Sequence, residues 1–150
     1  RDGINGGEIL GTRIWEAGYS VGVTGGHCDD NFSPPEAKSK ATGVADGPWA
    51  VRAKVRANIK YGANTIKVCA TGGVFSKGTK VGIQQLTEDE IRAAVEEAHM
   101  RGLIAAAHAH GTSGIKAAIR AGIDSIEHCS FLDDEAIKLA IKMGTYFSCD

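Results

Sequence analysis

Four histidines in this sequence stand where they could reach a common site. His108 and His110 lie in the stretch LIAAAHAHG, His128 lies in SIEHCS, and His27 lies in TGGHCDDN. Neutral imidazole is the side chain that most often binds metal ions in proteins. Histidines at the ends of adjacent parallel strands can converge on one ion, so the spacing makes His108 and His128 candidate metal ligands.

The pair His108 and His110 raises the question of whether both have the same role. We predict that they point to opposite faces of one strand and therefore differ in role. For each of the four histidines, the alternative is a packed or rim residue with a hydrogen-bonded ring. His99 lies near the predicted end of a helix, where the helix dipole favours a cation, and we assign it no function.

A lysine inside an apolar strand is the next unusual feature. Lys67 lies in TIKVCA, and lysine is almost never fully buried without a partner, because desolvation opposes its charge. Lys67 is therefore a candidate for the same site. The structural alternative is a lysine whose ammonium group extends from the mouth of the fold into water.

Other catalytic patterns and several partners are excluded. The loop GGVFSKGTK contains G-x-x-x-x-G, but Thr79 and Lys80 follow in the wrong order for a phosphate-binding P-loop. No G-x-S-x-G is present, which excludes a serine-hydrolase elbow. The net charge of −1 gives no reason to expect nucleic acid or an anionic membrane as partner. No apolar run approaches the ~20 residues that span a bilayer.

The cysteines Cys28, Cys69, Cys129 and Cys149 form no C-x-x-C pair. We predict reduced thiols, mostly packing, in an intracellular and cytoplasmic protein, with a periplasmic or secreted location as the alternative. Cys69 and Cys129 lie near the candidate site, but no base in their sequence context marks either as a nucleophile.

Helix and strand patterns alternate from about residue 44. Strands are predicted at 12–21, 64–71, 103–110, 124–130 and 145–149, and the helices between them end at Gly62, Gly102, Gly122 and Gly144. Helix starts are predicted at Asp46 with Pro48, at a capping box of Thr87 and Glu90, at Thr112 or Ser113, and at Asp133 or Asp134. The pattern indicates an α/β fold, and the short repeat of helix, glycine and strand favours a (β/α) barrel.

Two long polar loops, 22–43 and 71–86, follow predicted strands. Barrel enzymes build their active sites at this end of the strands, so we expect both loops to contribute to the site. About five strands are predicted, whereas a closed barrel has eight. We therefore expect the chain to be an internal piece of a longer protein.

Several motifs resemble those of a known family. TIKVCATGGVFS, AAAHAHG and GIDSIEHCSFLDDEAI occur in order, and TGGHCDDN and GVADGPWAVRAKVR agree with them. Together they resemble the amidohydrolase superfamily, in the branch of Xaa-Pro and Xaa-Arg dipeptidase-like, carboxypeptidase-like, prolidase-related and ochratoxin-hydrolysing enzymes. The resemblance covers nearly the whole chain and is specific for the branch but not for the substrate.

The resemblance implies a metal-dependent (β/α)8 TIM barrel with two Zn²⁺ ions. Residues 1–150 would form a partial catalytic barrel domain, about strands 3 to 7, with the first strands and the last strand missing from it. Lys67, as N6-carboxylysine, would be a metal ligand and catalytic residue together with His108 and His128. Two further histidines in an H-x-H motif would precede residue 1, and a catalytic aspartate would follow residue 150.

The same resemblance implies substrate binding for two other histidines. His110 would contact the substrate carboxylate or the tetrahedral oxyanion, and His27 would contact substrate from the loop after the third barrel strand. Glu127, which neighbours His128 in sequence, is treated as structural.

The activity implied by the resemblance is hydrolysis of amide or peptide bonds in small substrates, such as dipeptides or N-acyl amino acids, by a zinc-activated hydroxide. The alternatives are another amidohydrolase activity, on a cyclic amide, an imidazolone or a lactone, or a non-catalytic fragment with an incomplete metal site. The expected partners are a small-molecule or dipeptide substrate and further copies of the chain in a homo-oligomer, with no nucleic acid and no membrane.

Overall fold

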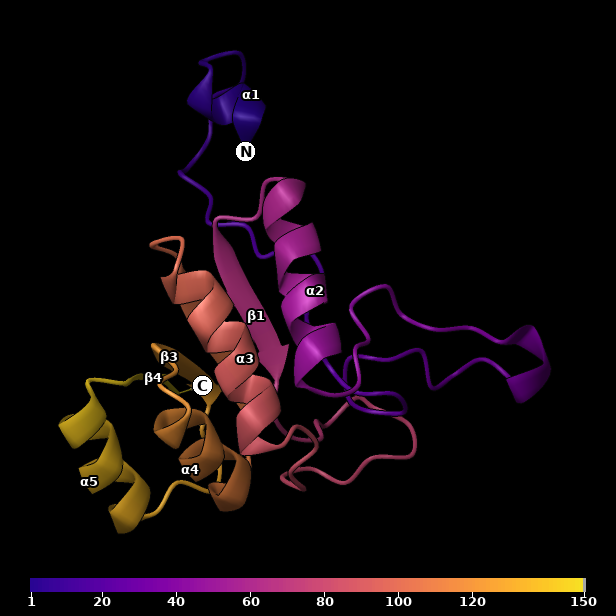
Figure 1. The fold of residues 1–150 in the computed structure, drawn as a ribbon, viewed down its shortest axis with the longest axis vertical. Coiled ribbons are helices and arrows are strands. Elements are labelled where there is room, and N and C mark those ends of the chain that lie inside the picture. Colours follow the sequence, from indigo (N-terminus) through magenta and orange to yellow (C-terminus); the bar gives the residue numbers. More distant parts are fainter. Residues whose placement is uncertain (150) are drawn as a thin grey trace.

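A parallel sheet with connecting helices forms the framework of the chain, whose residues 1–149 are described by a computed structural model. The strands β1 (Thr65–Cys69), β2 (Ile104–Ala109), β3 (Ser125–His128) and β4 (Tyr146–Ser148) lie in sequence order, and each pair is parallel. The helices α3 (Glu88–His99), α4 (Thr112–Arg120) and α5 (Asp134–Met143) connect consecutive strands, and α2 (Pro48–Lys60) precedes β1 (Figure 1). The predicted α/β class with a parallel sheet is confirmed.

The strand order also agrees with a segment of a (β/α) barrel. Consecutive strands are neighbours throughout, whereas a doubly wound sheet reverses its order at a switch point. Ile66 and Val68 of β1 and Ala105 and Ala107 of β2 are buried on one face, where α3 packs across both strands. The residues that alternate with them, Lys67 included, therefore face the opposite side, which is the interior in a closed barrel.

Local sequence signals explain where two of the helices begin. Thr87 and Glu90 form the predicted capping box of α3, and Asp133 caps α5 by accepting a hydrogen bond from the amide of Ala136. The predicted cap at Asp46 is wrong. Gly47, not Asp46, is the residue that precedes α2. Both carboxylate oxygens of Asp46 accept from Thr24 instead.

The predicted strand at 12–21 is also wrong. Within this segment Val21 forms an isolated bridge to β1, through its amide to the Lys67 carbonyl and through its carbonyl to the Cys69 amide, and the Glu16 carbonyl accepts from the Thr65 amide. Gly18 has a φ of 66°, which takes the backbone out of the extended region and ends any longer pairing. At the start of the chain is a short helix, α1 (Asp2–Asn5).

Loop 71–86 follows the carboxyl end of β1, as predicted, whereas loop 22–43 begins beside β1 after the isolated bridge at Val21 and not after a strand. Loop 22–43 extends away from the sheet and carries a 3-10 helix, η1 (Pro35–Ala37), at its far end (Figure 1). A disulfide joins Cys28 in this loop to Cys69 at the end of β1, so the prediction of reduced thiols is wrong for this pair. The two residues are 41 positions apart, and the pairing of Val21 with β1 places the start of the loop beside Cys69.

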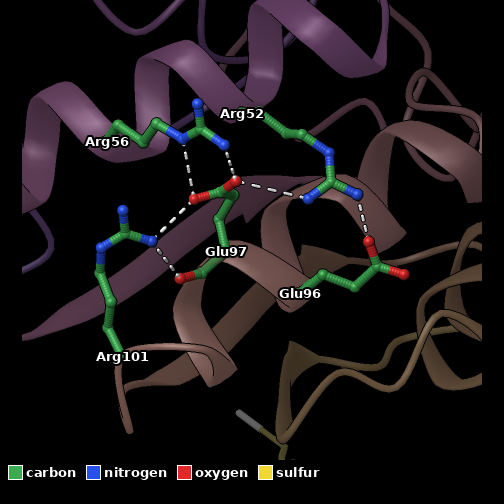
Figure 2. Close-up of polar contacts among 5 residues, drawn as sticks. All are labelled: Arg52, Arg56, Glu96, Glu97 and Arg101. Atoms are coloured by element: carbon green, nitrogen blue, oxygen red, sulfur yellow. Dashed lines mark hydrogen bonds and ion pairs between the residues drawn. The ribbon is translucent and has the colours of Figure 1, made fainter.

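A buried carboxylate fixes α2 against α3. Glu97 of α3 has no exposed side-chain surface and accepts from Arg56 at 3.0 Å and from Arg101 at 2.7 Å, while Arg52 lies 3.4 Å away (Figure 2). Arg52 also pairs with Glu96, which is half exposed. Hydrogen bonds from Arg56 and Arg101 lower the pKa of Glu97 to about 2, against the opposing effect of burial, so the network remains charged near neutral pH.

Among residues 1–149, no helix has the length and apolar character needed to cross a membrane.

Candidate metal centre

Three histidines meet at the carboxyl ends of β2 and β3. One ring nitrogen from each of His108, His110 and His128 lies within 4.8 Å of the corresponding atom of the other two. His27 stacks on His108, with ring centroids 4.1 Å apart and an angle of 19° between the planes. We refer to these four residues as the histidine cluster. All four sequence-predicted histidines are therefore brought together.

His108 is a buried member of the cluster, and burial has a clear effect on its pKa. It belongs to β2, opposite Cys69 of β1, and its Nε2 lies 3.4 Å from the Gly72 carbonyl oxygen. Burial, reinforced by the neighbouring His27, lowers the pKa of His108 to about 3. The ring is thus neutral at physiological pH, which is the form that binds a metal.

The prediction that His108 and His110 point to opposite faces is wrong. They are two residues apart, and positions i and i+2 of a strand share a face. Their ring centroids lie 4.7 Å apart in an edge-to-face arrangement. His110 is further fixed by Thr71, whose Oγ1 accepts its amide at 3.0 Å, and by Ser130, whose Oγ lies 2.8 Å from its Nδ1.

His128 reaches the cluster through an irregular backbone. The register places Glu127 opposite His108 and places His128 opposite Ala109, so regular alternation would turn the His128 ring away from the cluster. Instead, His128 has a φ of 77° and the next residue, Cys129, has a φ of 53°. This left-handed turn ends β3 and brings the His128 ring to 4.9 Å from that of His108.

Lys67 of β1 lies two residues before Cys69, so the two side chains share a face of the sheet. Cys69 pairs with His108, and Lys67 therefore lies on the face that carries His108. Burial lowers its pKa, and the negative charge of Glu127 on β3 opposes that shift. The structure thus places Glu127 near Lys67, a relationship that sequence adjacency to His128 did not indicate. Glu127 is itself oriented by the Ser125 hydroxyl, which donates to it at 2.9 Å.

His27 is held in place from several sides. Its amide donates to Oε1 of Gln85 at 2.8 Å, and its Nδ1 is hydrogen-bonded to the Ser76 hydroxyl. A side chain on Gly73 would collide with its ring, so this glycine permits the close approach. Burial lowers the pKa of His27, and positive charge on His128 would lower it further.

The histidine cluster lines one cavity of about 380 Å³. Its other walls are Val74 and Phe75 of loop 71–86 and Ser130 after β3. Sequence reasoning identified the loop as part of the site but not these residues, nor Thr71 and Gln85. A larger cavity of about 640 Å³, lined by segment 16–19 and α2, lies away from the cluster and contains none of its residues.

The cluster has the composition expected of a metal centre. Three imidazoles converge, and nitrogen donors of this kind suit zinc and neighbouring transition metals. His110 belongs to the converging group, although the sequence analysis gave it a role in substrate binding. The residues therefore fit a metal ion at the carboxyl ends of β2 and β3.

Comparison with known proteins identifies the family of the chain. Residues 4–150 match the model of a family described as the amidohydrolase family. The chain is 36% identical to ochratoxinase of Aspergillus niger over 159 aligned residues, which cover 96% of the chain and 33% of that enzyme. It thus spans about a third of the length of the curated relatives it matches.

Solved structures show the same similarity. A Xaa-Pro dipeptidase with methionine bound in its active site is 43% identical, with a TM-score of 0.86 over 98% of this chain and 37% of the other. The crystal structure of Aspergillus niger ochratoxinase is 34% identical, with a TM-score of 0.88 over 97% of this chain and 37% of the other. A prolidase described as putative, from Bifidobacterium longum, is 35% identical with a TM-score of 0.74, over 93% of this chain and 31% of that protein.

Proposed function

Because the chain belongs to the amidohydrolase family, we propose that it supplies part of the active site of a metal-dependent hydrolase that cleaves amide bonds in small substrates. Dipeptides and N-acyl amino acids are the proposed substrates. Similarity to a Xaa-Pro dipeptidase and to ochratoxinase supports this class.

One observation carries the proposal: three imidazoles converge where β2 and β3 end. His108 and His128 are the proposed metal ligands from this chain, with Zn²⁺ as the proposed ion. Burial keeps the His108 lone pair available, since the pKa of this ring is about 3. A metal bound there would polarise the amide carbonyl and activate water for attack.

Lys67 is the third proposed ligand, after carboxylation of its side chain. Its amine would attack carbon dioxide through the Nζ lone pair and release a proton, leaving an anionic carbamate. Burial lowers the pKa of Lys67, which increases the fraction of neutral amine that can react. The carbamate replaces an ammonium group beside the cluster with a negative charge that favours cations.

His110 and His27 are proposed to bind the substrate. The Ser130 hydroxyl lies within hydrogen-bond distance of Nδ1 of His110 and orients the ring, which would contact a substrate carboxylate or a developing oxyanion. His27 stacks on His108, and Ser76 fixes its ring. Both rings lie on the wall of the 380 Å³ cavity, where they would orient a substrate and exclude water.

The test uses the protein that contains this chain, with metal content and hydrolysis measured in parallel. In Lys67→Ala and His128→Ala, we expect bound zinc and the rate of dipeptide hydrolysis to fall by more than about 100-fold, since even outer partners of metal ligands change activity by 10–100-fold. His99→Ala is the matched control, because this exposed histidine pairs with Asp124 at the end of α3. Full activity in Lys67→Ala or His128→Ala would overturn the proposed metal centre.

A substrate panel separates the proposed activity from its alternatives. Dipeptides and N-acyl amino acids should be hydrolysed, whereas cyclic amides, imidazolones and lactones should not. The reverse preference would identify a different amidohydrolase activity. A protein that contains stoichiometric zinc and hydrolyses none of these compounds would favour a non-catalytic role.

A further inference from the structure

We propose that the disulfide between Cys28 and Cys69 positions His27 in the active site and that its reduction weakens substrate binding. The expected loss of substrate binding rests on the proposed function, whereas the expected movement of the His27 segment does not. Cys28 directly follows His27 in sequence, and Cys69 lies opposite His108 in the register of β1 and β2. The disulfide therefore joins the chain segments that carry the two stacked rings.

The remaining attachments of His27 to the body of the protein are noncovalent. Its amide donates to Gln85, and its ring is hydrogen-bonded to Ser76. Both partners belong to loop 71–86, which itself lacks helix or strand over most of its length. The disulfide fixes this part of loop 22–43 covalently to a strand of the sheet, since Cys69 is the last residue of β1.

Hydrogen bonds within loop 22–43 stabilise its shape but do not fix its position relative to the sheet. Asp29 accepts from the amides of Gly25 and Ala41, so it braces the loop internally. At its base, Val21 pairs with β1 and Gly22 pairs with Val44. Without the disulfide, we expect the loop to remain folded near its base while the segment around His27 moves away from His108.

The close packing at the disulfide supports a positioning role. A side chain on Gly22 would come within 3.0 Å of Cβ of Cys28, so the backbone at the loop base lies directly against the bridge. Cys69 is almost fully buried between that base and β2. A displacement of Cys28 therefore has to move the His27 backbone as well.

Reduction of this bond is a balanced exchange with a dithiol. The reductant supplies two electrons and two protons, its own thiols form a disulfide, and Cys28 and Cys69 become thiols. The change adds no group to the active site. Its expected effect is freedom of the His27 segment, which raises KM more than it lowers kcat, because His27 is proposed to bind substrate rather than to react.

The experiment compares the oxidised protein with the double variant Cys28→Ser, Cys69→Ser and with the dithiol-treated protein. We expect an increase in KM of about 10-fold, equivalent to the loss of one good contact, with kcat changed by less than about 2-fold. Cys149→Ser is the control, because Cys149 is an exposed thiol outside the site, and it should leave both constants unchanged. An unchanged KM in the double variant would overturn the proposal.

A mutant cycle distinguishes positioning of His27 from general destabilisation. His27→Ala should raise KM, and adding both serine substitutions to it should raise KM no further, because the bond acts through His27. If the effects multiply instead, the disulfide has only a structural role and the proposal fails.

Hydrogen exchange gives a readout that does not depend on hydrolysis. The His27 amide, which donates to Gln85, should exchange at least about 10-fold faster in the double variant and after reduction, while amides of β2 stay protected. Unchanged exchange at His27 would overturn the inference whatever the enzyme hydrolyses. Faster exchange in a protein that hydrolyses no amide would instead overturn the proposed function and leave the positioning role intact.

Discussion

The imidazole of His128 lies 4.9 Å from that of His108, although the strand register places Glu127 opposite His108. The left-handed backbone at His128 and Cys129 accounts for the difference, because it rotates His128 out of regular strand alternation. The same arrangement leaves Glu127 on the face of Lys67. A short segment of strained backbone therefore places the side chains of two adjacent residues, Glu127 and His128, on the same side of the sheet.

This geometry predicts that stability and metal binding depend strongly on the side chain at position 129. A β-branched residue is strongly disfavoured at positive φ, so Cys129→Val should destabilise the protein by about 1–3 kcal/mol and weaken metal binding. Cys129→Ala is the control, because it keeps an unbranched Cβ. Urea unfolding and zinc titration measure the two effects. Equal stability of the two variants would show that the backbone turn is not under the proposed strain.

The sequence predicted the parts of this fold that depend on neighbouring residues. The capping box of Thr87 and Glu90 and the N-cap at Asp133 need only residues three positions apart, and both were found. The four strands of the described sheet were likewise visible as short apolar segments between helices. The places of His108 and His128 at the ends of neighbouring parallel strands could be predicted, but the meeting of their rings also needs the left-handed backbone at His128 and Cys129.

Relationships between distant segments could not be predicted in the same way. The disulfide of Cys28 with Cys69 depends on the pairing of Val21 with β1, for which the sequence has no separate signal. The stacking of His27 on His108 depends on the path of a long loop. Gly18, with its positive φ, interrupts a segment whose apolar residues suggested a strand.

Thr71 is predicted to hold His110 in place. Its hydroxyl accepts the His110 amide and donates to the Gly72 carbonyl, and the side chain is fully buried. Thr71→Val keeps the shape but leaves the amide without its acceptor, which should cost about 1–3 kcal/mol of stability and raise KM. Thr71→Ser retains the hydroxyl and should rescue KM. Failure of serine to do better than valine would argue against a role for the hydrogen bond.

Because of His108, we expect the stability of the metal-free protein to depend on pH. Its pKa is about 3 in the folded state, below the ordinary value of 6.5, so the unfolded chain binds a proton more readily. The stabilising contribution is fully present above pH 6.5 and is lost progressively as the pH falls toward 3. Urea unfolding between pH 7 and pH 4.5, in the presence of a chelator, should show a smaller loss in His108→Gln than in the wild type. Parallel curves for the two proteins would contradict this prediction.

Glu97 predicts a second loss of stability at lower pH. Its pKa is about 2, below the ordinary 4.5, so its contribution is fully present above pH 4.5 and disappears as the pH falls toward 2. At pH 7, Glu97→Ala should destabilise the protein by about 3 kcal/mol, because Arg56, Arg101 and Arg52 lose a buried counter-charge. Glu96→Gln is the matched control on the same helix.

The control should lose less than about 1 kcal/mol, since Glu96 is half exposed and pairs only with Arg52. Glu97→Gln separates charge from packing, because the amide fills the same space between α2 and α3. Its unfolding midpoint should vary less between pH 4.5 and pH 2.5 than that of the wild type, whereas Glu96→Gln should follow the wild type. If Glu97→Gln retained the full acid sensitivity, Arg56 and Arg101 would not be what lowers the pKa of Glu97, and packing alone would join the two helices.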